Sequence, residues 1–157
     1  MGVSGSGKTT VGRLLAADLG WDFLDADDFH SPANRDKMSR GLPLSDADRE
    51  PWLDALAEAV AERSRAGRRA VLACSALKQS YRDRLQVEDG VRLVYLKGDP
   101  ETIERRLESR KGHYFAAGLL ASQFEALEEP TDALVVDLAE PPEAIVSRIE
   151  SEWGLGV

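Results

Sequence analysis

The sequence predicts an α/β fold, a three-layer sandwich in which helices cover both faces of a central parallel sheet. Short apolar runs alternate with stretches of helical periodicity along the whole chain of 157 residues. The run 70–74 is apolar throughout, as expected for a strand that is covered on both faces. The chain has no internal repeat and no low-complexity tract, so we predict one domain spanning residues 1–157.

Capping and helix-breaking residues place the individual elements. Ser31-Pro32 and Asp99-Pro100 each combine a capping side chain with a proline for the first helical turn, and Gly67 can end a long helix. The predicted strands are residues 23–24, 70–74, 91–96 and 133–136. The predicted helices are residues 9–19, 34–40, 48–66, 78–85, 100–110, 117–127 and 143–153.

Composition and charge exclude several classes of partner. The formal net charge is -8 and the isoelectric point is about 4.8, whereas binding a nucleic acid or an anionic membrane requires a basic face. Cys74 is the single cysteine, so no internal disulfide can form. No apolar run approaches the roughly 20 residues of a membrane span, and no signal peptide is evident. We therefore expect a soluble cytoplasmic protein.

A phosphate-binding loop opens the chain, because residues 2–9 fit the pattern G-x-x-x-x-G-K-[ST]. Its glycines let successive backbone N–H groups point into one concave nest, and the helix that follows adds the positive end of its dipole. Lys8 supplies a mobile charge for the outer phosphates, and the Thr9 hydroxyl is a suitable ligand for Mg²⁺. The residues predicted to contact the nucleotide are Gly2, Val3, Ser4, Gly5, Ser6, Gly7, Lys8, Thr9 and Thr10.

One element of this motif is not found in the sequence. A P-loop follows a buried central strand, yet only Met1 precedes Gly2. We therefore expect the first central strand to be missing from this chain, either because the start is assigned too late or because the strand is absent. A sheet without its central strand would expose unpaired edges and lose much of its core.

Two charged clusters are predicted at the carboxyl ends of strands, where open α/β sheets bind ligands. Asp25 and Asp27 follow the first predicted strand and would share one side if that segment were extended; they are also compatible with a solvated acidic loop. Lys78 and Arg82 follow the strand 70–74 and are four residues apart, which would place both cations on one helix face. Such a pair can bind a carboxylate, although an ordinary solvated basic face has the same spacing.

A third cluster, rich in cations, ends the helix predicted to begin at Pro100. Arg105, Arg106, Arg110 and Lys111 precede Gly112, and this density suits a lid, at about residues 110–118, that closes over ATP. Cations at a helix C-terminus also serve simply as partners of the helix dipole.

The remaining motifs narrow the class of P-loop protein. The only asparagine, Asn34, is followed by Arg35, so the guanine-reading Asn-Lys-x-Asp of GTPases is absent. The chain is also too short for the additional sheet of a motor or helicase. A compact kinase that acts on a small acceptor remains.

Taken in order along the chain, these clusters and further positions resemble the bacterial gluconokinases, small P-loop enzymes that phosphorylate D-gluconate with ATP. The matching positions are residues 1–8, 24–27, His30, Asn34, 37–38, Gly41, 43–44, Asp46, 48–49, 51–53, 74–78, 81–83, 95–98, 110–113 and 135–137. The resemblance implies a nucleoside-monophosphate-kinase-like fold, ATP and Mg²⁺ as cofactors, 6-phosphogluconate as product, and a homodimer.

The resemblance also implies roles for individual residues. Lys8, Arg106 and Arg110 would offset negative charge in the transition state, the two arginines by analogy with the lid of adenylate kinases. Asp25 or Asp27 would accept the proton of the 6-hydroxyl, and Thr9 with Asp25 would hold the metal, since no acidic residue ends the strand 70–74. The predicted substrate contacts are Asp27, His30, Arg35, Arg49, Lys78 and Arg82.

Two alternatives stay open. A shikimate-like or nucleotide kinase would share the phosphate loop and, for shikimate kinases, the spacing of Asp25 and Asp27. The chain lacks the Gly-Gly-Gly segment that shikimate kinases place beside the substrate, which ranks that alternative lower. A catalytically inactive nucleotide-binding protein, lacking the first strand, is the other alternative.

Overall fold

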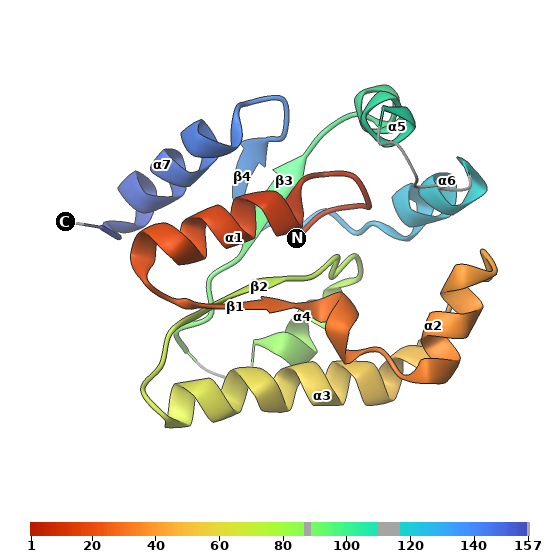
Figure 1. Ribbon diagram of the computed structural model, residues 1–157, viewed down its shortest axis with the longest axis horizontal. Coiled ribbons are helices and arrows are strands. Elements are labelled where there is room, and N and C mark those ends of the chain that lie inside the picture. The colour runs from red at the N-terminus through yellow and green to blue at the C-terminus, as the bar shows by residue number, and fades with distance from the viewer. Residues whose placement is uncertain (87–88, 110–116, 157) are drawn as a thin grey trace.

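A computed structural model describes residues 1–86, 89–109 and 117–156 of the protein (Figure 1). Its elements in chain order are α1 (Lys8–Leu19), β1 (Asp22–Asp25), the 3-10 helix η1 (Ala26–Phe29), α2 (Pro32–Ser39), α3 (Asp46–Arg65), β2 (Ala70–Ala73), α4 (Gln79–Leu85), β3 (Val94–Lys97), α5 (Pro100–Glu108), α6 (Ala117–Ala126), β4 (Leu134–Asp137) and α7 (Pro142–Trp153). Helices α1 and α7 lie on one side of the strands, and α3 and α4 on the other (Figure 1). The predicted α/β layering is confirmed.

Local sequence explains most helix boundaries. The Ser31 hydroxyl accepts the Asn34 N–H at 3.1 Å, and the Asp99 carboxylate accepts the Thr102 N–H at 2.8 Å, so both predicted caps are confirmed. Helix α3 begins two residues earlier than predicted, because Ser45 and Asp48 form a reciprocal capping box.

The turn after β1 differs from the extended segment considered for the acidic cluster. Residues Ala26–Phe29 form η1, whose first turn is closed by the Asp27 N–H donating to Asp25 Oδ1 at 3.1 Å. The indole of Trp52 on α3 donates to the Ala26 carbonyl at 2.7 Å and thereby ties this turn to α3. Asp25 and Asp27 therefore do not share one side of an extended strand.

The strands of the described residues form two separate two-stranded parallel sheets, β1-β2 and β3-β4. Met1 lies between them: its amino group donates to the Val94 carbonyl, and its own carbonyl accepts the Leu96 N–H at 3.0 Å. The Gly2 N–H then reaches the Ser75 carbonyl at 3.3 Å on the opposite side. The backbone of Met1 and Gly2 thus bridges the two sheets.

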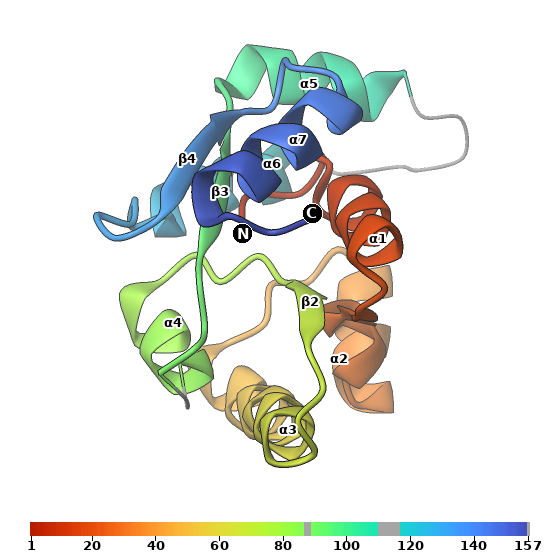
Figure 2. The same ribbon diagram turned by 90° about the vertical axis from the view of Figure 1, so that its left-hand side faces the viewer.

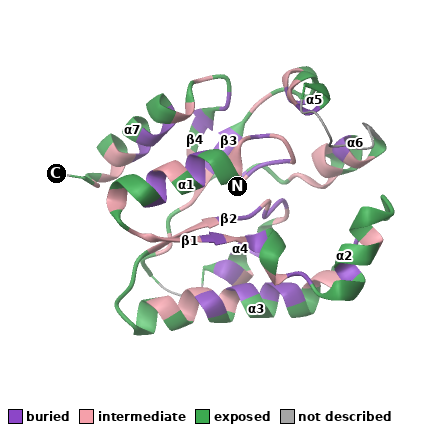
Figure 3. Ribbon diagram, viewed as in Figure 1, coloured by how far each residue is buried: buried purple, intermediate pink, exposed green. Residues whose placement is uncertain are grey.

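The hydrophobic core is divided in the same way, as the burial colouring indicates (Figure 3). The loop-side cluster joins α1, β3, β4, α5 and α7, and its buried members include Val11, Leu15, Leu96, Ile103, Val136, Ile145 and Ile149. The acceptor-side cluster joins η1, α3 and α4, and its members are Ala26, Trp52, Leu53, Leu56, Cys74, Ala76, Tyr81 and Leu85. Within the described residues, no helix is long and apolar enough to cross a membrane.

Candidate active site

The phosphate loop joins Met1 to α1 and depends on glycine at two positions in particular. Gly7, the residue before α1, has φ 96°, and Gly5 has φ 80°. A Cβ at Gly5 would also come within 2.9 Å of the Leu107 side chain on α5, so only glycine lets the loop pack there. These conformations explain the fixed glycines of the motif.

The N-terminus of α1 is arranged to receive an anion. In the described part of the chain, no side chain caps this helix and its first turn holds no acidic residue. Its first N–H groups and the positive end of its dipole therefore remain for phosphate. The Lys8 ammonium crosses the loop and donates to the Val3 carbonyl at 2.9 Å, close to where the outer phosphates of a bound nucleotide would lie.

Helix α6 holds the loop from the other side. The Ser4 N–H donates to Gln123 Oε1 at 2.7 Å, and Gln123 Nε2 donates to the Ser4 hydroxyl at 3.0 Å. The sequence analysis missed Gln123, because a glutamine 119 positions away carries no local signal of this contact.

The two residues predicted to hold a metal meet at the end of β1. The Thr9 hydroxyl donates to Asp25 Oδ2 at 3.0 Å. A hydroxyl and a carboxylate beside a phosphate nest are hard oxygen donors that suit Mg²⁺, whose other ligands are commonly phosphate oxygens and water. Among the described residues, no group of three or more acidic, histidine or cysteine side chains forms a metal cage. The donor set therefore fits a metal that arrives with the nucleotide.

His30 is a buried wall of the site. Its ring stacks on Trp52 with centroids 4.5 Å apart and planes 8° from parallel, and only 8% of the residue is exposed. Burial lowers the pKa of His30, with Asp27 opposing and Arg49 and Arg35 adding to the shift. The ring is thus neutral near pH 7, and its Nδ1 has no hydrogen-bond partner among the described residues.

A cluster of charged and aromatic side chains lies between α3 and α4. Lys78 Nζ contacts both Asp46 oxygens at 3.0 and 3.1 Å, the Tyr81 hydroxyl donates to the same carboxylate, and Arg49 lies 4.0 Å from it. Arg49 and Lys78 also lie over the Tyr81 ring, at 5.7 and 5.6 Å from its centroid. The Tyr81 hydrogen bond and then Lys78 lower the pKa of Asp46, while Asp46 raises that of Lys78. The structure therefore brings Arg49 and Lys78 together around one carboxylate.

The prediction that Arg82 meets a substrate carboxylate needs correction. Arg82 is 2% exposed, and its guanidinium donates to the Ala76, Leu77 and Glu128 carbonyls and to Gln79 Oε1 at 2.8–3.0 Å. It points inward from α4, whereas Lys78 precedes that helix and points outward to Asp46. The two cations therefore do not share one face, and Arg82 instead holds the turn after β2 together.

The remaining predicted residues are distributed around the same edge of the strands. Arg35 on α2 donates to the His30 carbonyl at 3.2 Å and to the Asp28 carbonyl at 2.9 Å, and Asp27 is exposed beside it. Arg106 on α5 donates to the Leu138 carbonyl, on the loop side. Arg110 and most of the lid predicted at about 110–118 lie outside the described residues.

Comparisons with known proteins show the family of this chain. A family model described as shikimate kinase matches residues 4–152. The thermoresistant gluconokinase of Escherichia coli (strain K12) is 47% identical over 152 residues, which cover 94% of this chain and 87% of that protein. The gluconokinase of Gluconobacter oxydans (strain 621H) is 49% identical over 133 residues, covering 84% of this chain and 75% of that protein.

Solved structures give the same result. A sugar kinase from Janibacter sp. HTCC2649, in an unliganded structure, superposes with a TM-score of 0.91 at 45% identity, covering 99% of this chain and 92% of that one. A gluconokinase from Sinorhizobium meliloti 1021 superposes with a TM-score of 0.86 at 39% identity, covering 98% of this chain and 93% of that one. These matches span nearly the whole chain and include both halves of the divided sheet.

Proposed function

The chain belongs to the gluconokinase family, and on that premise we propose that it transfers the terminal phosphoryl group of ATP to the 6-hydroxyl of D-gluconate. The observation that carries the proposal is the contact of Thr9 with Asp25, which joins the phosphate loop to the acidic turn after β1. A nucleotide on the loop and an acceptor beside that turn would place the two reacting groups at one edge of the strands.

On the loop side, we assign charge stabilisation to three cations. Lys8 lies across the loop and would stabilise the negative charge on the phosphoryl group as it is transferred. Arg106 would lie against the adenine or the phosphates, and Arg110 would close over them. Phosphoryl transfer needs little covalent help from a protein, so positioning and electrostatics would supply most of the rate.

On the acceptor side, Asp25 or Asp27 would take the proton of the attacking hydroxyl. The gluconate carboxylate would replace the Asp46 carboxylate beside Lys78 and Arg49, because these cations already hold an anion of the same chemistry. Arg35 and His30 would line the polyol between these two ends.

Mg²⁺ would be held by Thr9 and, directly or through water, by Asp25. When bound with ATP it would neutralise charge on the phosphates. We further propose that the enzyme acts in the cytoplasm and as a homodimer, for which the family resemblance is the support. Size-exclusion chromatography with light scattering tests the dimer.

An ADP-release assay over a panel of acceptors tests the proposed activity. We expect turnover with D-gluconate and Mg·ATP, and none above background with shikimate or nucleoside monophosphates. Turnover with one of those acceptors in place of gluconate would overturn the substrate assignment. ATP binding without turnover of any acceptor would instead indicate an inactive nucleotide-binding protein.

A further inference from the structure

The chain crosses from the loop side to the acceptor side directly after α6. Leu120, Phe124 and Leu127 pack into the loop-side cluster. Figure 2 shows α6 in the same half as α5 and α7, and α4 in the other half. Just after α6, the Glu128 N–H donates to the Leu77 carbonyl at 2.9 Å, in the turn that leads from β2 into α4. Residues 123–128, the bridging segment, therefore contact elements of both sides.

The first end of the bridging segment holds the phosphate loop. Gln123 is half-buried and lies on the same face of α6 as Leu120 and Phe124. Its Oε1 accepts the Ser4 N–H at 2.7 Å, and its Nε2 donates to the Ser4 hydroxyl at 3.0 Å. A side-chain amide can make both bonds at once, because it carries an acceptor and a donor. Gln123 therefore fixes the N–H and the hydroxyl of Ser4 together.

The other end of the bridging segment holds the start of α4. Within the described range 1–86, the side chain of Lys78, the N-cap residue of α4, makes no capping hydrogen bond. The Glu128 carboxylate supplies the acceptor instead: its Oε2 accepts the Gln79 N–H at 2.6 Å, at the positive end of the helix dipole. Because Lys78 directly precedes Gln79, this carboxylate holds the backbone from which Lys78 reaches Asp46.

We propose that the bridging segment couples the nucleotide site to the acceptor site, with Gln123 as the positioning residue for the phosphate loop and Glu128 as the positioning residue for Lys78. This inference rests on the proposed function, which puts ATP on the loop and the carboxylate of the acceptor beside Lys78. A bound nucleotide would order the loop and, through Gln123, the bridging segment. Because the first ligand orders groups that the second also needs, each should raise the affinity for the other by the same factor.

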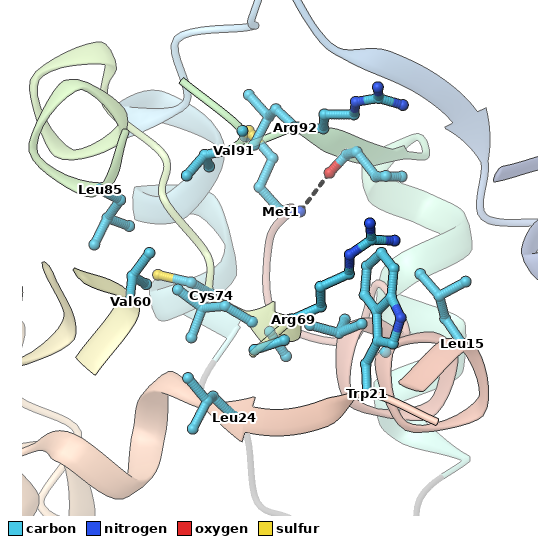
Figure 4. Close-up of a pocket in the computed structure, with 18 of the residues that line it drawn as sticks. Met1, Leu15, Trp21, Leu24, Val60, Arg69, Cys74, Leu85, Val91 and Arg92 are labelled. Atoms are coloured by element: carbon cyan, nitrogen blue, oxygen red, sulfur yellow. Dashed lines mark hydrogen bonds between the residues drawn. The ribbon is translucent and has the colours of Figure 1, made fainter. Parts of the chain in front are cut away.

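A second connection between the loop and the rest of the molecule runs through Met1 and Gly2. Met1 lines a cavity beside β2 and β3, and its amino group donates to the Val94 carbonyl (Figure 4). The Gly2 N–H reaches the Ser75 carbonyl at 3.3 Å. These two contacts lie away from the start of α4, and both are kept when Gln123 is replaced. Substitution therefore separates the two routes.

Amide hydrogen exchange tests the route from the loop to α4 without any acceptor. The full chain is compared with and without Mg²⁺ and a non-hydrolysable ATP analogue, below the thermal midpoint of every variant. In the parent, we expect the analogue to slow exchange of the Gln79 and Glu128 amides several-fold. Gln123→Ala, at saturating analogue, should lose this slowing while the Gly2 amide still responds. Ser122→Ala, on the exposed side of α6, is the matched control and should behave like the parent.

Calorimetric binding of D-gluconate, with and without the analogue, tests the acceptor end. We expect the analogue to raise the affinity of the parent for gluconate by about 5-fold. Glu128→Ala should reduce this factor to about 1 and leave the affinity for the analogue alone unchanged, because the Glu128 contacts shown by the described residues do not reach the loop.

Two further variants separate positioning from charge. Glu128→Gln keeps an acceptor oxygen for the Gln79 N–H and should restore most of the coupling factor. Glu129→Gln neutralises the adjacent exposed carboxylate, which contacts Tyr95 and Lys97 on β3, and should leave the factor as in the parent. An equal loss in Glu128→Ala and Glu129→Gln would overturn the proposal, because the loss would then follow from charge alone.

The exchange experiment can also contradict the inference. Full slowing at Gln79 in Gln123→Ala would show that the coupling runs through Gly2 and would overturn the proposal, as would a coupling factor that is unchanged in Glu128→Ala. A parent that binds the analogue but not gluconate would contradict the proposed function instead. In that case, slowing at Gln79 that depends on Gln123 would still support the route from the loop to α4, and its absence would overturn it.

Discussion

The loop half of the molecule and the acceptor half differ in how they use charge. In the loop half, α1, β3, β4, α5 and α7 enclose an apolar cluster, and the proposed phosphate site consists of backbone N–H groups and Lys8. In the acceptor half, the polar groups come from side chains, because Arg49, Lys78 and Tyr81 all contact Asp46. Backbone sites accept any phosphate chain, whereas side-chain sites select one acceptor. We therefore expect affinity for ATP to depend on the loop half and choice of substrate to depend on the acceptor half.

The largest expected effect is in the loop half. Lys8→Ala should lower kcat by about 10²–10³-fold, because one donor to the transferring group is lost in a site that works by electrostatics. The loss should be the same for every acceptor that turns over. Steady-state kinetics with ATP and gluconate measure this loss. A change confined to the gluconate KM would contradict the assignment of Lys8 to the loop half.

Arg82→Ala tests the boundary between the halves. Removing the guanidinium leaves the Ala76 and Glu128 carbonyls without the donor they have in the interior, and the Leu77 carbonyl keeps only the Glu128 N–H, so the free energy of unfolding should fall by about 3–5 kcal/mol. Urea unfolding measures this loss. At a temperature where the variant is folded, its gluconate KM should match that of the parent. A raised gluconate KM with an unchanged free energy of unfolding would instead indicate that Arg82 contacts the substrate.

Lys78→Ala tests the acceptor half. We expect the gluconate KM to rise about 10-fold, from loss of one charge-assisted contact, with the ATP KM unchanged. Stability should hardly change, because exposed ion pairs contribute about 0–1 kcal/mol. Arg65→Ala, which removes an exposed cation paired with Glu58 in the last turn of α3, is the matched control and should leave both KM values unchanged. Equal effects of the two variants would contradict the assignment of Lys78.

The last prediction concerns the pH dependence of stability at Met1, between the two halves. The amino group of Met1 has an ordinary pKa of 8.0 and a folded-state pKa of about 5, so the folded chain binds fewer protons than the unfolded one in this window. Its contribution to stability is present above pH 8 and is lost as the pH falls toward 5. The thermal midpoint should therefore fall by roughly 10 °C between pH 8 and pH 5.

Acetylation of the Met1 amino group provides the control for this pH dependence, because it removes the titrating group. His30 also has a lowered pKa and acts in the same direction, but it is common to both forms of the chain. The difference in midpoint between the acetylated and unmodified chains over this window therefore isolates Met1. The same pH profile for both forms would contradict a buried amino group.

The sequence predicted the elements whose signals are local. Proline after a capping side chain placed α2 and α5, and the phosphate motif placed the start of α1. The boundary of β3 was wrong by three residues, because residues 91–93 have the composition of a strand but face a cavity on one side. Strand formation depends on a neighbour that composition does not reveal.

The site was predictable in its chemistry but less so in its contacts. Thr9 and Asp25, both predicted as metal ligands, lie in contact because the start of α1 and the end of β1 are fixed by the fold, and their role on a metal stays a prediction. Spacing placed Lys78 and Arg82 on one helix face, yet Lys78 is the N-cap of α4 and has an extended backbone, so its side chain does not follow the helical spacing. Gln123 and Asp46 act through long-range contacts to Ser4 and Tyr81, for which helical periodicity gives no signal.

The most direct test of the account is identification of the product. The chain would be incubated with Mg·ATP and D-gluconate and the mixture followed by ³¹P NMR, with two-dimensional correlation to the sugar protons. The account predicts that the γ-phosphate signal is replaced by that of a phosphate monoester coupled to the protons on carbon 6. Inorganic phosphate alone, or an ester at another position, would contradict it.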